Sequence, residues 1–147
     1  MIQNQQRQVQ VKVASLSEFL ARACRAVKVA PDSLTVRLVT TAKMTRWNRA
    51  YRGKRGPTDV LSFPSDLADE TQPRANRGAR PDPYLGDIAI CPAVARRHAL
   101  SLDRTLDSEL RVLILHGILH LMGYDHETDT GQMDRRERRL RRALGLG

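Results

Sequence analysis

The segment from His116 to His126 reads HGILHLMGYDH and contains three of the chain's four histidines. His116 and His120 are four residues apart, and on a helix this spacing places two side chains on one face, about 5–6 Å apart at Cβ. Gly123 favours a left-handed turn, which would end the helix and return His126 toward the other two rings. Three imidazole nitrogens with a fourth position open are typical of catalytic zinc. The pattern therefore predicts one Zn²⁺ per chain, bound by His116, His120 and His126.

The residues around this motif predict the central helix of the fold. From Val112 to Met122 nearly every residue is apolar apart from the histidines and Gly117, and a helix that is apolar on all sides is buried. Acidic residues at 107 and 109 suit the helix N-terminus, where the helix dipole favours negative charge. We therefore expect the metal at the end of a buried helix, at the wall of the core.

The spacing HxxxHxxGxxH also occurs in metzincin proteases, with one difference. The glutamate that follows the first histidine there, and acts as general base, is replaced by Gly117. A metalloprotease is therefore one alternative, disfavoured because glycine cannot accept a proton. A non-catalytic protein with a structural zinc is another. Structural sites usually have a fourth protein ligand, often cysteine, and Cys24 and Cys91 are far from the motif in sequence.

Length and composition narrow the class of protein. A chain of 147 residues fits one domain over residues 1–147 whose core needs no disulfides. The net charge of +9 and the pI of about 10.5 favour polyanions such as nucleic acid. Aromatic residues make up only 4%, which disfavours a base-stacking sheet of the RRM kind. The two cysteines are isolated, which favours a reducing compartment. The sequence shows neither a signal-peptide pattern nor an apolar run of membrane-spanning length. We therefore expect a cytoplasmic protein without membrane contact.

Hydrophobic periodicity predicts a mixed α/β fold. Ser15 and Glu18 have the spacing of a capping box at the start of the first helix. We expect one α/β (α+β) domain, with a mixed sheet of about four strands and about five helices, and a long mobile surface loop over 65–83. The predicted strands are 9–13, 34–38, 60–63 and 85–91, and the predicted helices are 15–27, 40–51, 92–100, 107–122 and 132–144.

Three blocks of the sequence together resemble the YbeY family of bacterial endoribonucleases. They are YRG at 51–53 with PTDVLSFP at 57–64, then LGDI at 85–88, then the histidine motif. The resemblance runs to about Leu140 and implies a zincin-like fold and a zinc-dependent ribonuclease. Such an enzyme matures ribosomal RNA, especially the 3′ end of the small-subunit RNA, and acts in ribosome quality control. The implied partners are ribosomal RNA and the small ribosomal subunit, and the non-catalytic alternative becomes a ribosome-assembly factor.

Carried over by position, the three histidines match the zinc ligands of the family, and Arg52 matches an arginine held to be essential for its activity. Two segments depart from the family pattern. The segment 65–84 is longer and richer in proline and arginine than the usual linker of the family. The segment after Met133 is richer in arginine than is usual in the family. Substrate contacts in these two segments are therefore not carried over.

The matched residues imply metal-assisted cleavage of a phosphodiester in single-stranded RNA, with His116 and Arg52 as catalytic residues. A guanidinium stays charged and binds two phosphoryl oxygens at once, which suits the negative charge of the transition state. DNA is not expected as a substrate. The general base remains open, because metal hydroxide alone or the RNA 2′-hydroxyl could attack, and a nearby acid could instead orient a histidine. The candidate acids are Asp59, Asp87, Asp125 and Glu127.

Two basic stretches, 46–55 and 135–142, are predicted to contact RNA phosphates, because clustered lysine and arginine provide most of the non-specific affinity for nucleic acid. The candidate phosphate-binding residues are Arg46, Arg49, Lys54, Arg55, Arg135 and Arg139.

Overall fold

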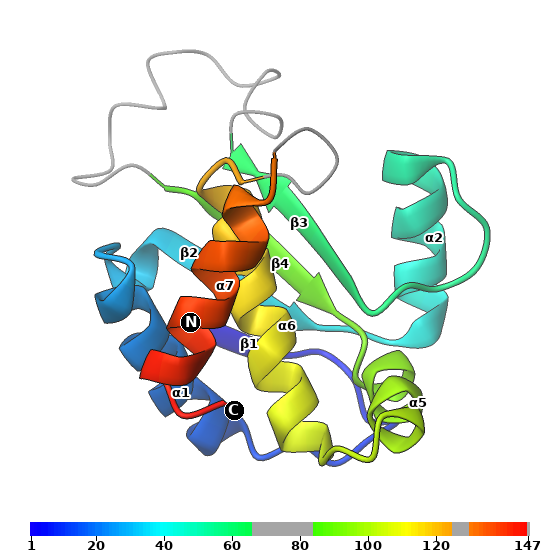
Figure 1. Cartoon of the computed structure of the whole chain (residues 1–147). Coiled ribbons are helices and arrows are strands. Elements are labelled where there is room, and N and C mark those ends of the chain that lie inside the picture. The colour runs from blue at the N-terminus through cyan, green and yellow to red at the C-terminus, as the bar shows by residue number, and fades with distance from the viewer. Residues whose placement is uncertain (66–83, 125–129, 147) are drawn as a thin grey trace.

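A computed structural model of the chain describes residues 1–65, 84–124 and 130–146 (Figure 1). The predicted loop over 65–83 lies almost wholly outside these residues. Within them, no helix is long and apolar enough to cross a membrane. The described elements are β1 (Ile2–Asn4), α1 (Val13–Ala26), the 3-10 helix η1 (Pro31–Ser33), β2 (Leu34–Leu38), α2 (Thr41–Arg52), β3 (Val60–Pro64), β4 (Gly86–Ile90), α5 (Pro92–Ser101), α6 (Leu106–Leu121) and α7 (Gln132–Ala143).

The four described strands form one mixed sheet in the order β1-β2-β4-β3. The strands β1, β2 and β4 are parallel, and β3 pairs with β4 in the antiparallel direction. β3 is therefore an edge strand, with Ser62 paired to Ile88 and Phe63 paired to Asp87. The expected α/β fold with four strands and five helices is confirmed for the described part of the chain.

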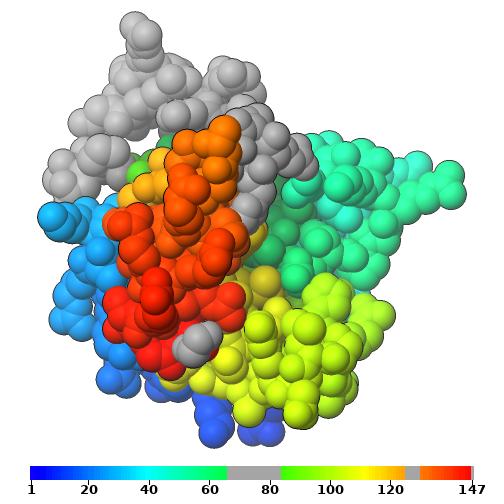
Figure 2. Space-filling view, viewed as in Figure 1, coloured from blue at the N-terminus to red at the C-terminus, as the bar shows by residue number. Residues whose placement is uncertain are grey.

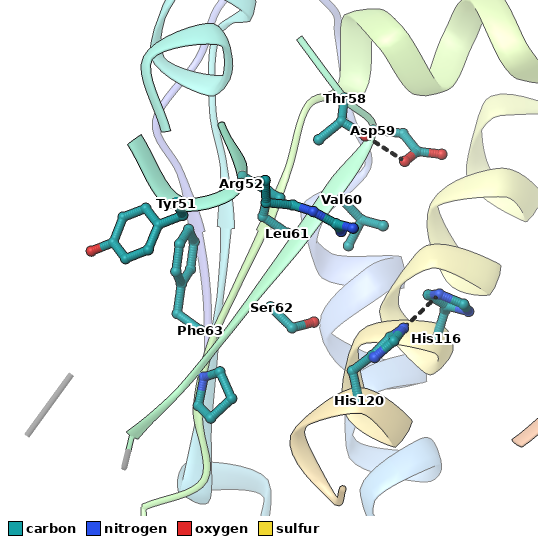
Figure 3. A pocket seen from close by; sticks show the side chains of 11 residues that line it. Tyr51, Arg52, Thr58, Asp59, Val60, Leu61, Ser62, Phe63, His116 and His120 are labelled. Atoms are coloured by element: carbon teal, nitrogen blue, oxygen red, sulfur yellow. Dashed lines mark hydrogen bonds between the residues drawn. The ribbon is translucent and has the colours of Figure 1, made fainter. Parts of the chain in front are cut away.

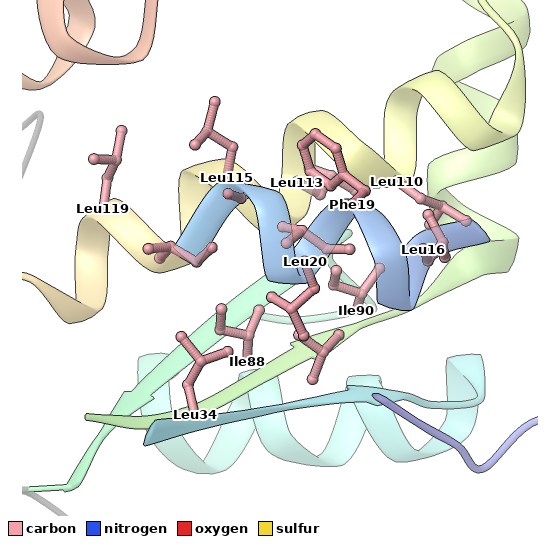
Figure 4. Close-up of a cluster of buried hydrophobic side chains, with 14 of the residues drawn as sticks. Leu16, Phe19, Leu20, Leu34, Ile88, Ile90, Leu110, Leu113, Leu115 and Leu119 are labelled. Atoms are coloured by element: carbon pink, nitrogen blue, oxygen red, sulfur yellow. The ribbon is translucent and has the colours of Figure 1, made fainter. Parts of the chain in front are cut away.

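Helices cover both faces of the sheet, and this is why its central strands are buried on both sides. On one face, Ile88 and Ile90 of β4 pack with α1 and α6 in the larger apolar cluster (Figure 4). On the other face, Ala89 packs in a smaller cluster with Met44 of α2 and Val94 of α5. Successive side chains of a strand point to opposite faces, so consecutive residues along β3 or along β4 lie on different faces of the sheet.

The predicted strand over 9–13 is wrong. Val13 is the first residue of α1, and β1 forms instead from Ile2–Asn4, which pairs with β2. The side-chain amide of Gln6 donates to the Val9 carbonyl and accepts from the Val9 N–H, both at 2.9 Å, so Val9 is buried without a strand partner. The alternation of valine with polar residues over 9–13 indicated a half-buried segment, but it did not show which segment pairs with β2.

The predicted capping box at Ser15 and Glu18 is also wrong. α1 begins two residues earlier, and its N-cap residue, Lys12, makes no side-chain cap hydrogen bond. Ser15 lies inside the helix, and its hydroxyl accepts a hydrogen bond of 2.8 Å from Arg111 of α6. The Ser15 hydroxyl, which the capping-box spacing assigned to the helix N-terminus, therefore makes a tertiary contact with α6 instead.

The long buried helix α6 places the histidine motif against the sheet. Thr105 caps it by accepting from the Ser108 N–H at 3.1 Å, and two acidic residues occupy its first turn, as predicted. Gly117 allows the close approach of α6 to β4. A Cβ added at Gly117 would lie 2.7 Å from Cγ2 of Ile88, which is closer than packed carbons allow.

We predict that Gly117→Ala lowers the free energy of unfolding by about 1–3 kcal/mol, because the added methyl group overpacks the contact with Ile88. Urea denaturation followed by circular dichroism measures this change. In an Ile88→Ala background the same substitution has space, and the higher helix propensity of alanine should make it neutral or stabilising. An equal loss in both backgrounds would contradict the steric explanation.

Candidate active site at the edge of the sheet

A cavity of about 430 Å³ lies beside the edge strand β3, between α6 and the C-terminal end of α2. Figure 3 shows the imidazoles of α6 on one side of β3, with Arg52 directed toward them from α2. In Figure 2, atoms of α6 are visible in a hollow between α7, in orange-red, and the teal region of α2 and β3. The lining residues are Tyr51, Arg52, Thr58, Asp59, Val60, Leu61, Ser62, Phe63, Pro64, His116 and His120.

The rings of His116 and His120 converge in this cavity. Their Nε2 atoms are 3.0 Å apart, and both side chains are partly exposed. Two nitrogens on a tetrahedral zinc, at about 2.0–2.1 Å from the metal, are about 3.3 Å apart, so this pair needs little movement to bind one cation. Gly123 has a φ of +98°, and its N–H donates to the His120 carbonyl, so the predicted left-handed turn after the helix is present.

A carboxylate that the sequence reasoning missed contacts the first of these rings. Oε1 of Glu137, in α7, lies 3.1 Å from Nδ1 of His116, and the side chain of Glu137 is nearly buried. An ionised carboxylate only accepts hydrogen bonds, so the proton of a neutral His116 is on Nδ1 and its Nε2 lone pair faces the cavity. Carboxylates that orient metal-binding histidines make this same contact.

The sequence did contain a signal for Glu137. α7 buries Met133, Glu137 and Leu140, which are spaced four and three residues apart and therefore share one helical face. Its apolar members, Met133 and Leu140, mark the buried face on which Glu137 also lies. An acid on the buried face of an arginine-rich helix indicates a buried polar partner, here His116.

The β3 side of the cavity provides a carboxylate and hydroxyls. Asp59, a predicted candidate for the general base, lines the cavity, and its Oδ2 is 3.2 Å from Nδ1 of His98. Thr58 donates to the other carboxylate oxygen of Asp59 at 3.4 Å. Ser62, which the sequence reasoning also missed, points toward His120 and donates to the Gly117 carbonyl at 3.4 Å. These groups can bind or reposition a proton beside the histidine pair.

Asp87 is not brought to the histidines. It lies on the opposite face of the sheet, where Oδ2 pairs with Nε of Arg37 at 3.0 Å and Oδ1 accepts from the Tyr84 hydroxyl. Burial, followed by the hydrogen bond to Asp87, raises the pKa of Tyr84 above its ordinary value, so its hydroxyl stays protonated and donates. Asp87 thus has two donors of its own and lines a separate cavity.

The other predicted site residues fall into two groups. His126, Asp125 and Glu127 lie outside the described residues, and the described residues contain no group of three side chains that could bind a metal. The predicted phosphate-binding residues are all exposed, and none of them lines the histidine cavity. These residues are Arg46, Arg49, Lys54, Arg55, Arg135 and Arg139.

Neither cysteine belongs to the site. Cys24 is buried in the larger apolar cluster and Cys91 in the smaller one, and neither lines the histidine cavity. Burial raises the pKa of the Cys24 thiol, so that this side chain stays a neutral, apolar part of the core. An α/β fold that gathers paired imidazoles, an arginine and a carboxylate in one cavity has the parts of a hydrolase site.

Comparisons with known proteins identify the family. The family described as endoribonuclease YbeY matches residues 1–145. The chain is 43% identical over 117 residues to endoribonuclease YbeY of Frankia casuarinae, an alignment that covers 80% of this chain and 57% of that protein. It is 41% identical over 136 residues to endoribonuclease YbeY of Koribacter versatilis, covering 92% and 80% respectively. The chain belongs to the YbeY endoribonuclease family, which makes it a nuclease and confirms the resemblance found in the sequence.

A solved structure agrees with this assignment. The solution structure of TM1509 from Thermotoga maritima is 28% identical and has a TM-score of 0.58. The match covers 98% of this chain and 89% of that one. The fold of the two proteins is therefore shared over nearly their whole lengths.

Proposed function

We propose that this protein is a zinc-dependent, single-strand-specific endoribonuclease that matures ribosomal RNA. Its proposed substrate is the 3′ end of the small-subunit RNA, its partner is the small ribosomal subunit, and its further role is in ribosome quality control in the cytoplasm. The observation that carries the catalytic part of the proposal is the pair of Nε2 atoms, 3.0 Å apart, in the same cavity as Arg52.

The donor set fits zinc. His116 and His120 present Nε2 from one helix face, and the contact with Glu137 favours the tautomer of His116 whose Nε2 is unprotonated, as a metal ligand must be. His126 would supply the third nitrogen. A bound zinc ion supplies Lewis-acid chemistry that activates water and offsets phosphoryl charge.

The protein's own groups have distinct roles in this proposal. Arg52 binds two non-bridging oxygens of the scissile phosphate and stabilises the charge that they gain in the transition state. Asp59 is the only acid among the described residues that line the cavity. It accepts a proton from the attacking water as that oxygen bonds to phosphorus and the bond to the leaving ribose oxygen breaks. Ser62 hydrogen-bonds the same phosphate from the β3 side.

The two alternative functions have less support. In metzincin-type proteolysis the residue after the first histidine is a catalytic glutamate, whereas Gly117 is packed against Ile88 with no space for a side chain. A structural zinc needs a closed site, whereas the described histidines face a cavity and both cysteines are buried elsewhere. The family consists of endoribonucleases, which agrees with neither alternative.

We predict that His116→Ala and His120→Ala each abolish cleavage of single-stranded RNA, because each removes a nitrogen from the proposed zinc site. Cleavage of a labelled oligoribonucleotide is measured with and without a chelator, with casein as the protease substrate and circular dichroism to verify folding. Cleavage of casein by the wild type, or cleavage of RNA at the normal rate by folded variants, would contradict the proposal.

We predict that Glu137→Gln lowers the zinc affinity of the RNA-free protein about 10- to 100-fold, the range found when a carboxylate that orients a metal-binding histidine is changed. Competition with a chelating indicator measures this affinity. Asp134→Asn is the matched control, because it removes another acid from the same helix. The Asp134 side chain is 51% exposed and pairs with Arg138. Equal losses in the two variants would attribute the effect to net charge instead of to the hydrogen bond.

We predict that Arg52→Ala lowers kcat/KM for RNA by about 10²–10³-fold, because a preorganised donor to the transition-state charge is lost. Zinc content, measured by atomic emission, stays at the wild-type level. Arg25→Ala, which removes an exposed arginine from the last turn of α1, is the control for net charge. A similar loss of activity in both variants would show that Arg52 acts only through long-range electrostatics.

A further inference from the structure

A second cavity, of about 280 Å³, adjoins the histidine cavity. Arg37, Lys43, Trp47, Tyr51, Phe63 and Asp87 line it. Three of these are among the chain's six Phe, Tyr and Trp residues, so a protein poor in aromatic residues places half of them together. A cavity of about 150 Å³ is enough for a benzene ring, so this one can admit a planar nucleobase.

The two cavities are continuous through shared side chains. Tyr51 and Phe63 line both of them. In Figure 3, Arg52 points toward the histidines, whereas the ring of Tyr51 lies beside Phe63, away from the histidines. Consecutive residues of a helix point about 100° apart, so the last turn of α2 presents one side chain to each cavity.

The Tyr51 ring is open to a ligand. The residue is 68% exposed, although its ring contacts the Phe63 ring in an edge arrangement with centroids 4.6 Å apart and planes at 67°. The Trp47 ring also contacts Phe63 edge-on, with centroids 5.6 Å apart and planes at 84°. Edge contacts hold the rings in position while leaving a ring face free for stacking.

The charges around the cavity suit a base with an adjoining phosphate. Arg37 and Asp87 pair at 3.0 Å, so together they add hydrogen-bonding groups without net charge at the wall. Nζ of Lys43 lies 5.0 Å from the centre of the Trp47 ring, and among the described residues Lys43 has no ion pair. A neutral base can enter beside the paired charges, with Lys43 available to the phosphate that follows it.

We propose that the second cavity binds one unpaired base of the RNA strand, stacked on Tyr51, next to the phosphate held by Arg52. This inference rests on the proposed endoribonuclease function and extends it by naming the contact that selects single strands. A base inside a duplex is stacked on its neighbours and paired, so it cannot reach the ring, whereas an unpaired base can turn outward and stack.

The single tryptophan provides a direct test. Trp47 lines the cavity, so a base bound there should quench the intrinsic fluorescence of the protein. We expect quenching by a short oligouridylate and none by an abasic ribose-phosphate oligomer of equal length, each titrated into the full chain carrying His120→Ala to prevent cleavage. Equal responses to the two oligomers would contradict base stacking.

Substitution of Tyr51 in that same background tests the ring itself. Tyr51→Leu should weaken oligouridylate binding about tenfold, from the usual strength of a base–aromatic stack, and abolish the preference over the abasic oligomer. Tyr51→Phe keeps the ring and should bind like the parent chain. Leu100→Ala removes an apolar side chain that is 74% exposed on α5, and should also have no effect. Unchanged binding by Tyr51→Leu would overturn the inference.

The outcomes separate this inference from the proposed function. The fluorescence titration requires no cleavage, so a wild-type chain that stacks the base but never cuts RNA would contradict the proposed activity alone. A chain with Tyr51→Leu that cuts single-stranded RNA with wild-type KM and kcat would contradict the stacking site alone. Tyr51→Leu should also narrow the difference in cleavage between single-stranded and duplex RNA, whereas an unchanged ratio would argue against selection by this ring.

Discussion

The contact between Gly117 of α6 and Ile88 of β4 controls the position of the candidate active site. A Cβ at Gly117 would be 2.7 Å from the isoleucine, so α6 can lie this close to the sheet only because the residue has no side chain. His116 precedes the glycine and His120 follows it by three residues, and both rings line the cavity beside the edge strand β3. A position that supplies a general base in metzincins is here used for packing. In the proposed function the acid that accepts a proton must therefore come from another segment, and Asp59, the residue before β3, lines the same cavity.

The edge strand β3 divides two chemical environments. Because successive strand residues point to opposite faces, Ser62 points toward the histidine pair while Phe63 joins the aromatic group of the second cavity. The last turn of α2 divides in the same way, with Arg52 directed to one side and Tyr51 to the other. An extended polynucleotide crossing this edge would meet the histidines and Arg52 on one side and the aromatic rings on the other.

Local patterns predicted most elements, and the errors have physical causes. The helices α2, α5, α6 and α7 lie close to their predicted ranges, because the helical hydrophobic pattern depends on residues close in sequence. The valines at 9–13 failed as a strand because pairing requires a partner elsewhere in the chain, and β2 pairs with Ile2–Asn4 instead. Glu137 was missed as a site residue because the helical pattern marks it as buried but does not identify its partner, His116, which lies 21 residues away.

The sequence by itself determined that two histidines share one helix face, that Arg52 is a candidate site residue, that the fold is α/β, and which family the chain resembles. Each of these follows from residue spacing or from contiguous motifs. Only the tertiary structure decided that Asp59 lies beside the histidines while Asp87 lies on the other face of the sheet. It also decided that Glu137 contacts Nδ1 of His116 and that three aromatic rings line one cavity next to Arg52. The physical reason is that strand order, register and helix packing arise from contacts between distant segments, whereas periodicity records only which side of its own element a residue occupies.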